Sequence, residues 1–367
     1  MRSITSRCFS TAIKFTKNGQ AAAVLKSENY TLTQQKLGSK DVLVKMLAAP
    51  INPADINMVE GVYGITAKLP AVGGSEGVGQ VSQIGSDVKS LKVGDWVIPS
   101  APGFGTWRQD AVAEESSFMQ VPNNISKAYA ATIAVNPCTA YRLLRDFVSL
   151  KPGDVIIQNG ANSMVGLAVI QMARDMGVRT INIVRSDRPN TEKVLQMLTN
   201  YGGDINIPDT YVNSAGFKDI IADLPPIKLA FNCIGGDVIA DMARNLGNNA
   251  TIVTYGSMSK KSLSLPADVV NYKQLNLKGF WISAWNSTHS MNERKTMIND
   301  IANMIRTNHL SFLYEMHDLD DFDYALSKHN EPFYLRKVVL DLDFPDRFKE
   351  HDTLPESEYE AFETMAV

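Results

Sequence analysis

The chain has 367 residues, of which 44% are hydrophobic and 20% charged, a composition typical of a folded soluble protein with room for two domains. Its formal charge of -3 and sequence pI of about 6.0 exclude a general attraction to nucleic acid or to an anionic membrane surface. It also has no run of about 18 apolar residues, which excludes a membrane-spanning helix. An anionic ligand would therefore have to be held by a local cluster of charges.

The first residues have the composition of a mitochondrial transit peptide. They include Arg2 and Arg7 among several serines and threonines, and the first acidic residue is Glu28. We therefore expect residues 1–13 to be a leader and the protein to lie in the mitochondrial matrix; a short disordered or strand-forming N-terminus is the alternative. A reducing compartment also fits the cysteines, which are odd in number and far apart: Cys8, Cys138 and Cys233.

Two kinds of pattern follow each other along the chain. Residues 20–125 read as short β-like runs broken by Gly and Pro, which predicts an irregular β-domain. From Lys151 the run DVIIQ, a helix VGLAVIQMARDMG that ends at Gly177, and the run TINIV form one βαβ unit. KLAFNCIG, GDVIADMARNLG and ATIVTYG repeat this alternation. The sequence therefore predicts an α/β protein with a doubly wound parallel sheet.

The last third of the chain changes pattern again. After LNLKGFWI it predicts an amphipathic helix over MNERKTMINDIANMIRTNHL and then a strand in FYLRKVVLDLD. We expect this stretch to return to the β-domain, so that residues 14–137 and 282–367 form one domain and 138–281 the inserted nucleotide domain. The acidic ending HDTLPESEYEAFETMAV is expected to be a surface tail.

The turn between DVIIQ and its helix is a candidate pyrophosphate site. A Gly-rich turn before a helix presents backbone N–H groups and the positive end of the helix dipole to an anion. In NGANSMVG, Gly160 and Gly166 occupy the expected positions, but Met164 stands where a central Gly is usual. A plain strand-to-helix turn is the alternative, so neighbouring residues must decide.

The end of the second strand of this unit indicates the type of dinucleotide. An acidic residue there would bind the ribose hydroxyl of NAD, whereas this chain has Arg185, Ser186, Asp187 and Arg188. Guanidinium groups bind a 2′-phosphate, so the position favours NADP, although Asp187 opposes this unless it points to solvent. FNCIGG and TYGSM, which end two further strands, would complete the crevice.

Several ordered segments resemble one known family. AAPINPADINMVEGVYG, LPAVGGSEGVGQV, AVNPCTAYRLL, NGANSMVGLAVIQMA and LKGFW are similar to segments of the mitochondrial trans-2-enoyl-thioester reductases, and the similarity runs from about residue 14 to residue 342. The resemblance implies a GroES-like β-domain joined to a Rossmann domain, as in the medium-chain dehydrogenase/reductase superfamily. It also implies a homodimer in which the edge strands of the nucleotide sheets pair.

Zinc chemistry is not expected. Zinc alcohol dehydrogenases have a Gly-His-Glu segment where this chain has Gly74, Ser75 and Glu76. The first histidine is His289, and the N-terminal domain has no Cys beyond Cys8, so a site with three protein ligands cannot be assembled there. A side-chain acid must therefore supply the proton.

The resemblance implies the reaction and its residues. Hydride passes from NADPH to the β-carbon of a trans-2-enoyl thioester carried by CoA or acyl carrier protein, and a proton is then added at the α-carbon. Tyr63 in GVYG matches the proton donor, and a phenol keeps its proton at neutral pH; the alternative is a loop tyrosine that packs at the domain interface. The other implied contacts are with the cofactor: Asn136, Asn162, Ser163, Met164, Val165, Arg185, Ser186, Arg188, Tyr255, Gly256, Ser257, Met258, Phe280, Trp281, Ile282 and Lys337.

Some of these positions have simpler explanations. Asn136 precedes Pro137 and could form an Asx turn, and Phe280 and Trp281 could be core aromatics. Two other functions also stay open, a quinone or other activated-alkene reductase on the same scaffold and a non-catalytic NADPH-binding protein.

Overall fold

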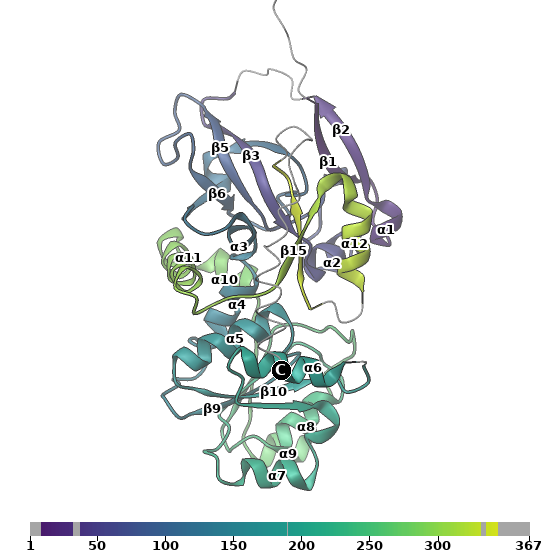
Figure 1. The fold of residues 1–367 in the computed structure, drawn as a ribbon, viewed down its shortest axis with the longest axis vertical. Coiled ribbons are helices and arrows are strands. Elements are labelled where there is room, and N and C mark those ends of the chain that lie inside the picture. The colour runs from purple at the N-terminus through teal and green to yellow at the C-terminus, as the bar shows by residue number, and fades with distance from the viewer. Residues whose placement is uncertain (1–8, 32–36, 189, 332–334, 344–367) are drawn as a thin grey trace, which may run out of the picture.

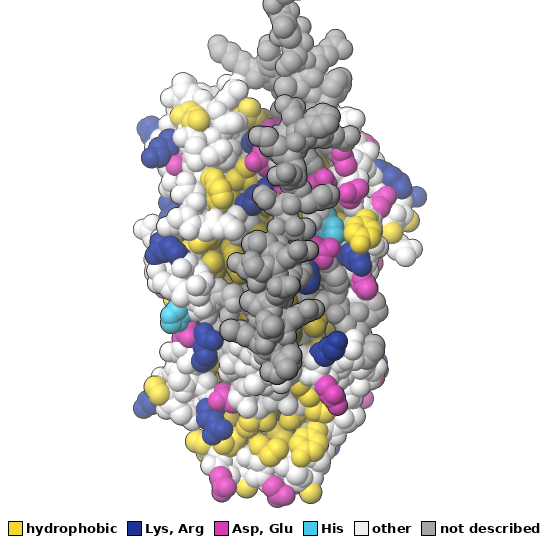
Figure 2. Space-filling model, in the orientation of Figure 1, with side chains coloured by type: hydrophobic (Ala, Val, Ile, Leu, Met, Phe, Trp, Pro, Cys, Tyr) yellow, Lys and Arg dark blue, Asp and Glu magenta, His cyan; other side chains and the backbone are white. Residues whose placement is uncertain are grey.

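The computed structural model describes residues 9–31, 37–188, 190–331 and 335–343. Two lobes are stacked along the long axis (Figure 1). One contains the twisted strands β3, β5 and β6, the other contains β9, β10 and their helices, and the helices α4, α10 and α11 lie between the lobes. Within these residues no helix is both long and apolar enough to cross a membrane. Acidic and basic side chains are interspersed over both lobes on the face shown in Figure 2, in keeping with the small net charge.

The second lobe is built on six parallel strands in the order β11-β10-β9-β12-β13-β14. This order is the doubly wound arrangement of dinucleotide-binding folds, and it confirms the predicted fold class. β9 is buried along its whole length, which explains the continuous apolar run in the sequence. The strands are β9 Val155–Asn159, β10 Arg179–Val184, β11 Ile205–Pro208, β12 Leu229–Asn232, β13 Thr251–Thr254 and β14 Asn276–Gly279.

One expectation about this sheet was wrong. The alternation read from the sequence makes ATIVTYG the fourth strand, but it is the fifth in chain order because INIP also forms a strand, β11. That strand is four residues long and mostly half-exposed, so it lacks the apolar run that marks the others. The helices are α5 Met164–Asp175, α6 Thr191–Asn200, α7 Ala215–Ala222, α8 Val238–Arg244 and α9 Ala267–Tyr272.

The first lobe holds a seven-stranded sheet in which β15-β16-β3-β5-β6-β8 are neighbours and β7 pairs with β3. β15 and β16 come from the C-terminal part of the chain, and β16 pairs antiparallel with β3. The chain therefore returns to this lobe after completing the parallel sheet. The strands are β3 Asp41–Pro50, β5 Val78–Ile84, β6 Trp96–Pro99, β7 Asp110–Glu114, β8 Phe118–Val121, β15 Tyr314–Asp318 and β16 Lys337–Asp341.

A smaller three-stranded sheet, in the order β2-β1-β4, completes this lobe. Its strands are β1 Phe9–Phe15, β2 Lys26–Thr31 and β4 Ala71–Val72. The expected leader, residues 1–13, therefore overlaps a strand: residues 1–8 lie outside the described part of the chain, but β1 begins at Phe9 and buries Ser10, Ala12 and Ile13. The acidic ending also lies outside the described residues.

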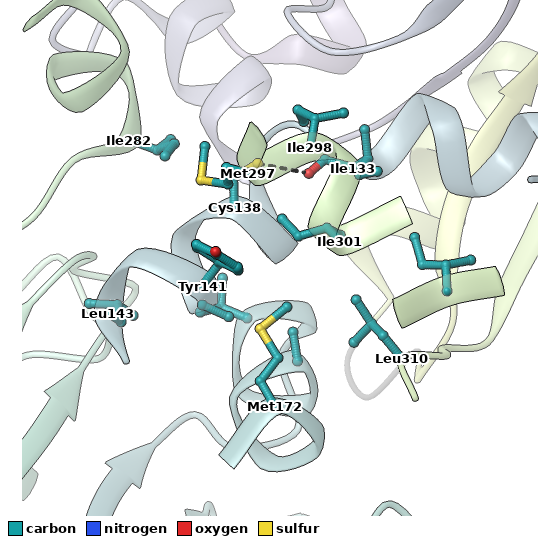
Figure 3. Close-up of a cluster of buried hydrophobic side chains, with 14 of the residues drawn as sticks. Ile133, Cys138, Tyr141, Leu143, Met172, Ile282, Met297, Ile298, Ile301 and Leu310 are labelled. Atoms are coloured by element: carbon teal, nitrogen blue, oxygen red, sulfur yellow. Dashed lines mark hydrogen bonds between the residues drawn. The ribbon is translucent and has the colours of Figure 1, made fainter. Parts of the chain in front are cut away.

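Within the described residues, α-helices also flank or join the sheets outside the nucleotide lobe. They are α1 Ala21–Val24, α2 Pro53–Glu60, α3 Lys127–Thr132, α4 Asn136–Leu143, α10 Ile282–Thr288, α11 Met291–Arg306 and α12 Phe322–Asn330. The junction between the lobes is a packed core. Figure 3 shows Cys138 and Tyr141 of α4, Met172 of α5 and Ile301 of α11 pointing toward one another.

Candidate functional site

The two halves of the parallel sheet meet between β9 and β12, where the strand order reverses. Ligands of such sheets bind at the carboxyl ends of the strands near this point. Two buried amides and a half-buried hydroxyl cross it: the Asn159 amide donates to Asn232 Oδ1 (2.8 Å), and the Asn232 amide donates to Thr254 Oγ1 (3.1 Å). Asn159, Asn232 and Thr254 thus tie the ends of β9, β12 and β13 together and fix the loops that follow.

The first of these loops leads into α5. Gly160 has a φ of +61°, which a side chain rarely adopts, and a Cβ on Gly166 would lie 2.4 Å from the carbonyl oxygen of Ala161. Ser163 is the N-cap of α5, and its hydroxyl accepts a hydrogen bond from the N–H of Gly166 (3.1 Å). Met164 begins the helix and is half-buried. The turn keeps the close helix–strand packing without the central Gly.

The loop after β10 carries the predicted phosphate-binding residues. Asp187 Oδ1 lies 3.8 Å from Arg185 Nε and 3.5 Å from Arg188 Nε, so this carboxylate pairs with both guanidinium groups. The Ser186 hydroxyl donates to Asp209 Oδ1 (2.6 Å). Two positive side chains are therefore together at the end of β10, but a neighbouring acid is their present partner.

The loop after β13 lies beside the α5 turn. The Tyr255 hydroxyl is buried near Ser163 and Cys233 and has no hydrogen bond of normal geometry among the described residues. Burial raises the pKa of Tyr255 well above its usual range, so the phenol stays neutral. Gly256 packs against Cys233, whereas Met258 is exposed.

Tyr63 and Trp281 meet across the two lobes. Tyr63 lies two residues beyond Gly61, whose φ of +78° ends α2, and Trp281 is the N-cap residue of α10. The indole Nε1–H of Trp281 donates a hydrogen bond to the Tyr63 hydroxyl (2.8 Å), and the two rings meet edge to face with centroids 5.7 Å apart. Trp281 is 39% exposed and is therefore not a core aromatic. Phe280 packs on Phe147, and Ile282 is buried at the start of α10.

Asn136 and Lys337 belong to a buried polar network that the sequence did not reveal. The Lys337 ammonium donates to the carbonyl oxygen of Ile51 (2.8 Å) and to Asn52 Oδ1, and Asn136 Nδ2 lies 3.4 Å from the same Asn52 oxygen. Glu76 Oε2 accepts a hydrogen bond from Asn52 Nδ2 (2.9 Å), and its Oε1 accepts one from the N–H of Val135 (2.8 Å). Lys337 is only 6% exposed.

The charges in this network perturb each other. Burial raises the pKa of Glu76 to about 7 and lowers the pKa of Lys337 to about 8, and the opposite charge of the partner limits both shifts. Burial also raises the pKa of Asp55, which accepts a hydrogen bond from the Asn52 N–H (3.0 Å). A buried acid–base pair of this kind is weak evidence for stability and is a frequent feature of functional sites.

Comparisons with known proteins place this geometry in a family. Residues 38–123 match the family described as alcohol dehydrogenase GroES-like domain, and residues 165–300 match the one described as zinc-binding dehydrogenase. The mitochondrial enoyl-[acyl-carrier-protein] reductase of Dictyostelium discoideum is 43% identical over 334 residues, which is 91% of this chain and 95% of that protein. The chain belongs to the mitochondrial enoyl-acyl carrier protein reductases.

Other members of this family are similarly close. The enoyl-[acyl-carrier-protein] reductase of Rattus norvegicus is 45% identical over 330 residues, 90% of this chain and 88% of the relative. Among solved structures, the mitochondrial 2-enoyl thioester reductase Etr1p/Etr2p heterodimer from Candida tropicalis has a TM-score of 0.83 and 31% identity, covering 91% of this chain and all of that one. Etr1p in complex with NADP and crotonyl-CoA has the same TM-score at 30% identity, with the same coverage of both chains. The protein is thus a mitochondrial one, as its composition predicted.

The residues of this reductase fit NADPH but not zinc. The capped start of α5 and the two arginines after β10 suit a phosphorylated dinucleotide. Despite the name of the matching family, no three His, Cys, Asp or Glu side chains gather into a possible metal site within the described residues. Asp55 and Glu76 face the Lys337 ammonium instead.

The predicted residues of this reductase form three groups. Asn162–Val165 form the α5 turn with Tyr255 beside it, Arg185, Ser186 and Arg188 follow β10, and Tyr63 meets Trp281 at the lobe interface. Ser257 and Met258 contact their own loop and Cys233 instead, through Lys261 and the Cys233 carbonyl oxygen. Lys337 is brought to Asn136 only through Asn52. Asn52 and Glu76 were missed as site residues, although the sequence does place Glu76 where the zinc enzymes have their Gly-His-Glu segment.

Proposed function

We propose that this protein reduces the double bond of trans-2-enoyl thioesters of CoA or acyl carrier protein, with NADPH as the reductant and Tyr63 as the proton donor. The names of its relatives and the complex of Etr1p with NADP and crotonyl-CoA support the reaction. The observation that carries the residue assignment is the contact of the Tyr63 hydroxyl with Trp281 at the interface of the two lobes.

The direction of that hydrogen bond leaves the Tyr63 O–H available as a proton donor. An indole N–H is only a donor, so the Tyr63 oxygen is the acceptor and its own O–H is free to donate to a substrate. When bound, NADPH supplies the hydride to the β-carbon. Tyr63 then gives its proton to the α-carbon, and the Trp281 N–H stabilises the phenolate that remains until water restores the proton.

The other residues are assigned to binding. The first turn of α5 offers backbone N–H groups to the pyrophosphate, and Arg185 and Arg188 hold the 2′-phosphate after Asp187 has been displaced. Asn136 lies at the nicotinamide end, where Phe280, Trp281 and Ile282 provide an apolar wall that excludes water. Lys337 acts indirectly in this proposal, because its ammonium group holds the Asn52 side chain that meets Asn136.

A coupled assay tests this proposal. The protein should oxidise NADPH when trans-2-hexenoyl-CoA is added, much faster than it oxidises NADH, and faster than with a quinone in place of the thioester. Tyr63→Phe should lower kcat by about 100-fold or more, because a positioned acid typically contributes that much, while the Kd for NADPH is unchanged. Tyr272→Phe, at an exposed tyrosine of α9, is the control. Full activity in Tyr63→Phe would remove the proton-donor role.

We also propose that the protein forms a homodimer through β14. This strand is the edge of the parallel sheet, all four of its residues are exposed, and Leu277 is 51% exposed. An open edge of this kind is a template for pairing with another strand. Sedimentation should show a dimer that Leu277→Lys weakens; a monomeric parent chain would contradict the proposal.

A further inference from the structure

The buried carboxylate of Glu76 lies where three parts of the site meet. It is 2% exposed and touches Asn52, the residue before α2, and Val135, the residue before α4. α2 leads to Tyr63, and α4 begins with Asn136. The reaction proposed above uses no proton from Glu76, so its burial has another explanation.

The chemistry of the neighbours fixes the direction of each hydrogen bond. An ionised carboxylate only accepts, so the Asn52 amide must turn its NH2 group toward Glu76. The Asn52 oxygen then faces the Lys337 ammonium, which only donates, and this locks the amide from the other side. An amide held between an anion and a cation has one stable orientation.

The same logic extends one residue further, to Asn136. Its side chain meets the Asn52 oxygen, an acceptor, so Asn136 must present its own NH2 group there, as the Nδ2 to Oδ1 distance of 3.4 Å records. The Asn136 Oδ1 atom is thereby turned away from Asn52 and is left as an acceptor. The charge of Glu76 therefore determines which end of the Asn52 amide faces Asn136, and through it which end of the Asn136 amide is left as an acceptor.

We propose that Glu76 and Lys337 are positioning residues that orient the Asn136 amide through Asn52, so that Asn136 presents an oxygen to the ligand and selects for an amide N–H. This inference rests on the proposed function, in which that ligand group is the carboxamide of the nicotinamide. It accounts for two opposite buried charges that contact the same Asn52 side chain, and it gives Lys337 a role that needs no contact with the ligand.

Other charges face this pair and must be kept intact in a test. Asp55 on α2 faces Lys337, His329 on α12 is sensitive to the Lys337 charge, and the Cys138 thiol on α4 is sensitive to Glu76. Burial raises the pKa of that thiol well above its usual range, so Cys138 is neutral and does not compete for the Glu76 carboxylate.

The experiment compares ligands that differ in whether the substituent on the pyridine ring carries N–H donors. Calorimetry at pH 8 would measure the Kd of NADP+, of its thionicotinamide analogue, which keeps the amide N–H groups, and of its 3-acetylpyridine analogue, which has none. The parent chain should bind the acetylpyridine analogue about fivefold to tenfold more weakly than the other two, which is the usual worth of one hydrogen bond. Asn136→Leu should lose this preference.

Glu76→Gln decides the proposal. A glutamine can turn either its oxygen or its NH2 group to Asn52, so the Asn52 and Asn136 amides no longer have one fixed orientation. The preference for the amide-bearing ligands over the acetylpyridine analogue should therefore fall to about twofold or less, with little change in the Kd of the acetylpyridine analogue. Glu114→Gln, at an exposed carboxylate, is the matched control. If Glu76→Gln does not fold, Glu76→Gln combined with Lys337→Met, which removes both charges, replaces it and should show the same loss.

A preference that survives in the Glu76 variants, or in Asn136→Leu, would overturn the inference. Failure of the proposed function is a separate result, since it would appear as no turnover of any enoyl thioester by a chain that still distinguishes the three ligands.

Discussion

Asp187 occupies the position between the two arginines that are proposed to hold the 2′-phosphate. Its carboxylate pairs with both Arg185 and Arg188, although it is itself highly exposed. An incoming phosphate must therefore replace an interaction that already exists. The sequence alone showed the conflict between Asp187 and this phosphate, and the structure shows that the acid does not point away from the arginines.

We predict that Asp187→Asn strengthens NADPH binding. Removing the competing charge should lower the Kd for NADPH by about 1.5-fold to fivefold, the range expected for exposed ion pairs, and should leave the Kd for NADH unchanged. Fluorescence titration at low and moderate salt measures both. Asp223→Asn, at an exposed acid after α7, is the control. Weaker NADPH binding would instead mean that Asp187 holds the arginines ready for the phosphate.

At the scale of single residues, sequence reasoning found the groups that follow parallel strands but not the network behind them. Arg185 was predicted because a βαβ unit fixes where its loops emerge, whereas the cofactor contacts of Ser163 and Tyr255 were implied by the family resemblance. Glu76 and Lys337 were not paired, because no local pattern links side chains so distant in the chain: Lys337 and Asn52 are 285 positions apart. Only the three-dimensional pairing of β16 with β3 brings them together.

At the scale of elements, β1 defines how much of the N-terminus the fold needs. It is the central strand of the β2-β1-β4 sheet, the Ile13 N–H donates to the carbonyl oxygen of Trp107 (2.9 Å), and the Ser10 hydroxyl donates to Asp110 (2.8 Å). A leader that ended at residue 13 would remove most of this strand, whereas one that ended at residue 8 would spare it.

Two truncated chains should therefore behave differently. A chain that begins at Phe9 should have the same Tm as the full chain, because β1 is intact. A chain that begins at Lys14 should lose about 2–5 kcal/mol of unfolding free energy, since the buried Ala12 and Ile13 and the paired backbone of β1 are gone. Urea unfolding followed by circular dichroism compares them. Equal stability of the two truncated chains would show that β1 contributes little.

Elements were predicted well where a clear period or a continuous apolar run marks them. β9, α5 and β10 lie within a residue or two of the segments that the sequence indicated. β11 escaped notice because its two isoleucines alternate with Asn206 and Pro208, and three of its four residues are half-exposed. The return of β15 and β16 to the first lobe was expected, but its register with β3 depends on long-range pairing that a single sequence does not specify.

At the scale of the whole molecule, one hydrophobic core runs through the junction of the lobes. It includes Ile98 of β6 in the first lobe, Ile156 of β9 in the second, and Ile301 of α11 between them. Figure 3 shows the part of this core around Ile301. Domains joined by a small polar interface unfold separately, whereas a continuous apolar core couples them. The lobe interface at which Tyr63 meets Trp281 is thus held by a packed junction.

We predict that the two lobes unfold in one cooperative transition and that a cavity at the junction destabilises both. Ile301→Ala, at a fully buried side chain, should reduce the free energy of unfolding by about 2–5 kcal/mol. Ile220→Ala, at an exposed isoleucine on α7, should change it little. Scanning calorimetry of both variants, with and without NADPH, reports the number of transitions. The proposed NADPH contacts lie mainly in the second lobe, so a single peak that NADPH moves as a whole requires coupling through the junction. A second peak that does not move with NADPH, with Ile301→Ala shifting only one of the two peaks, would show that the lobes unfold independently.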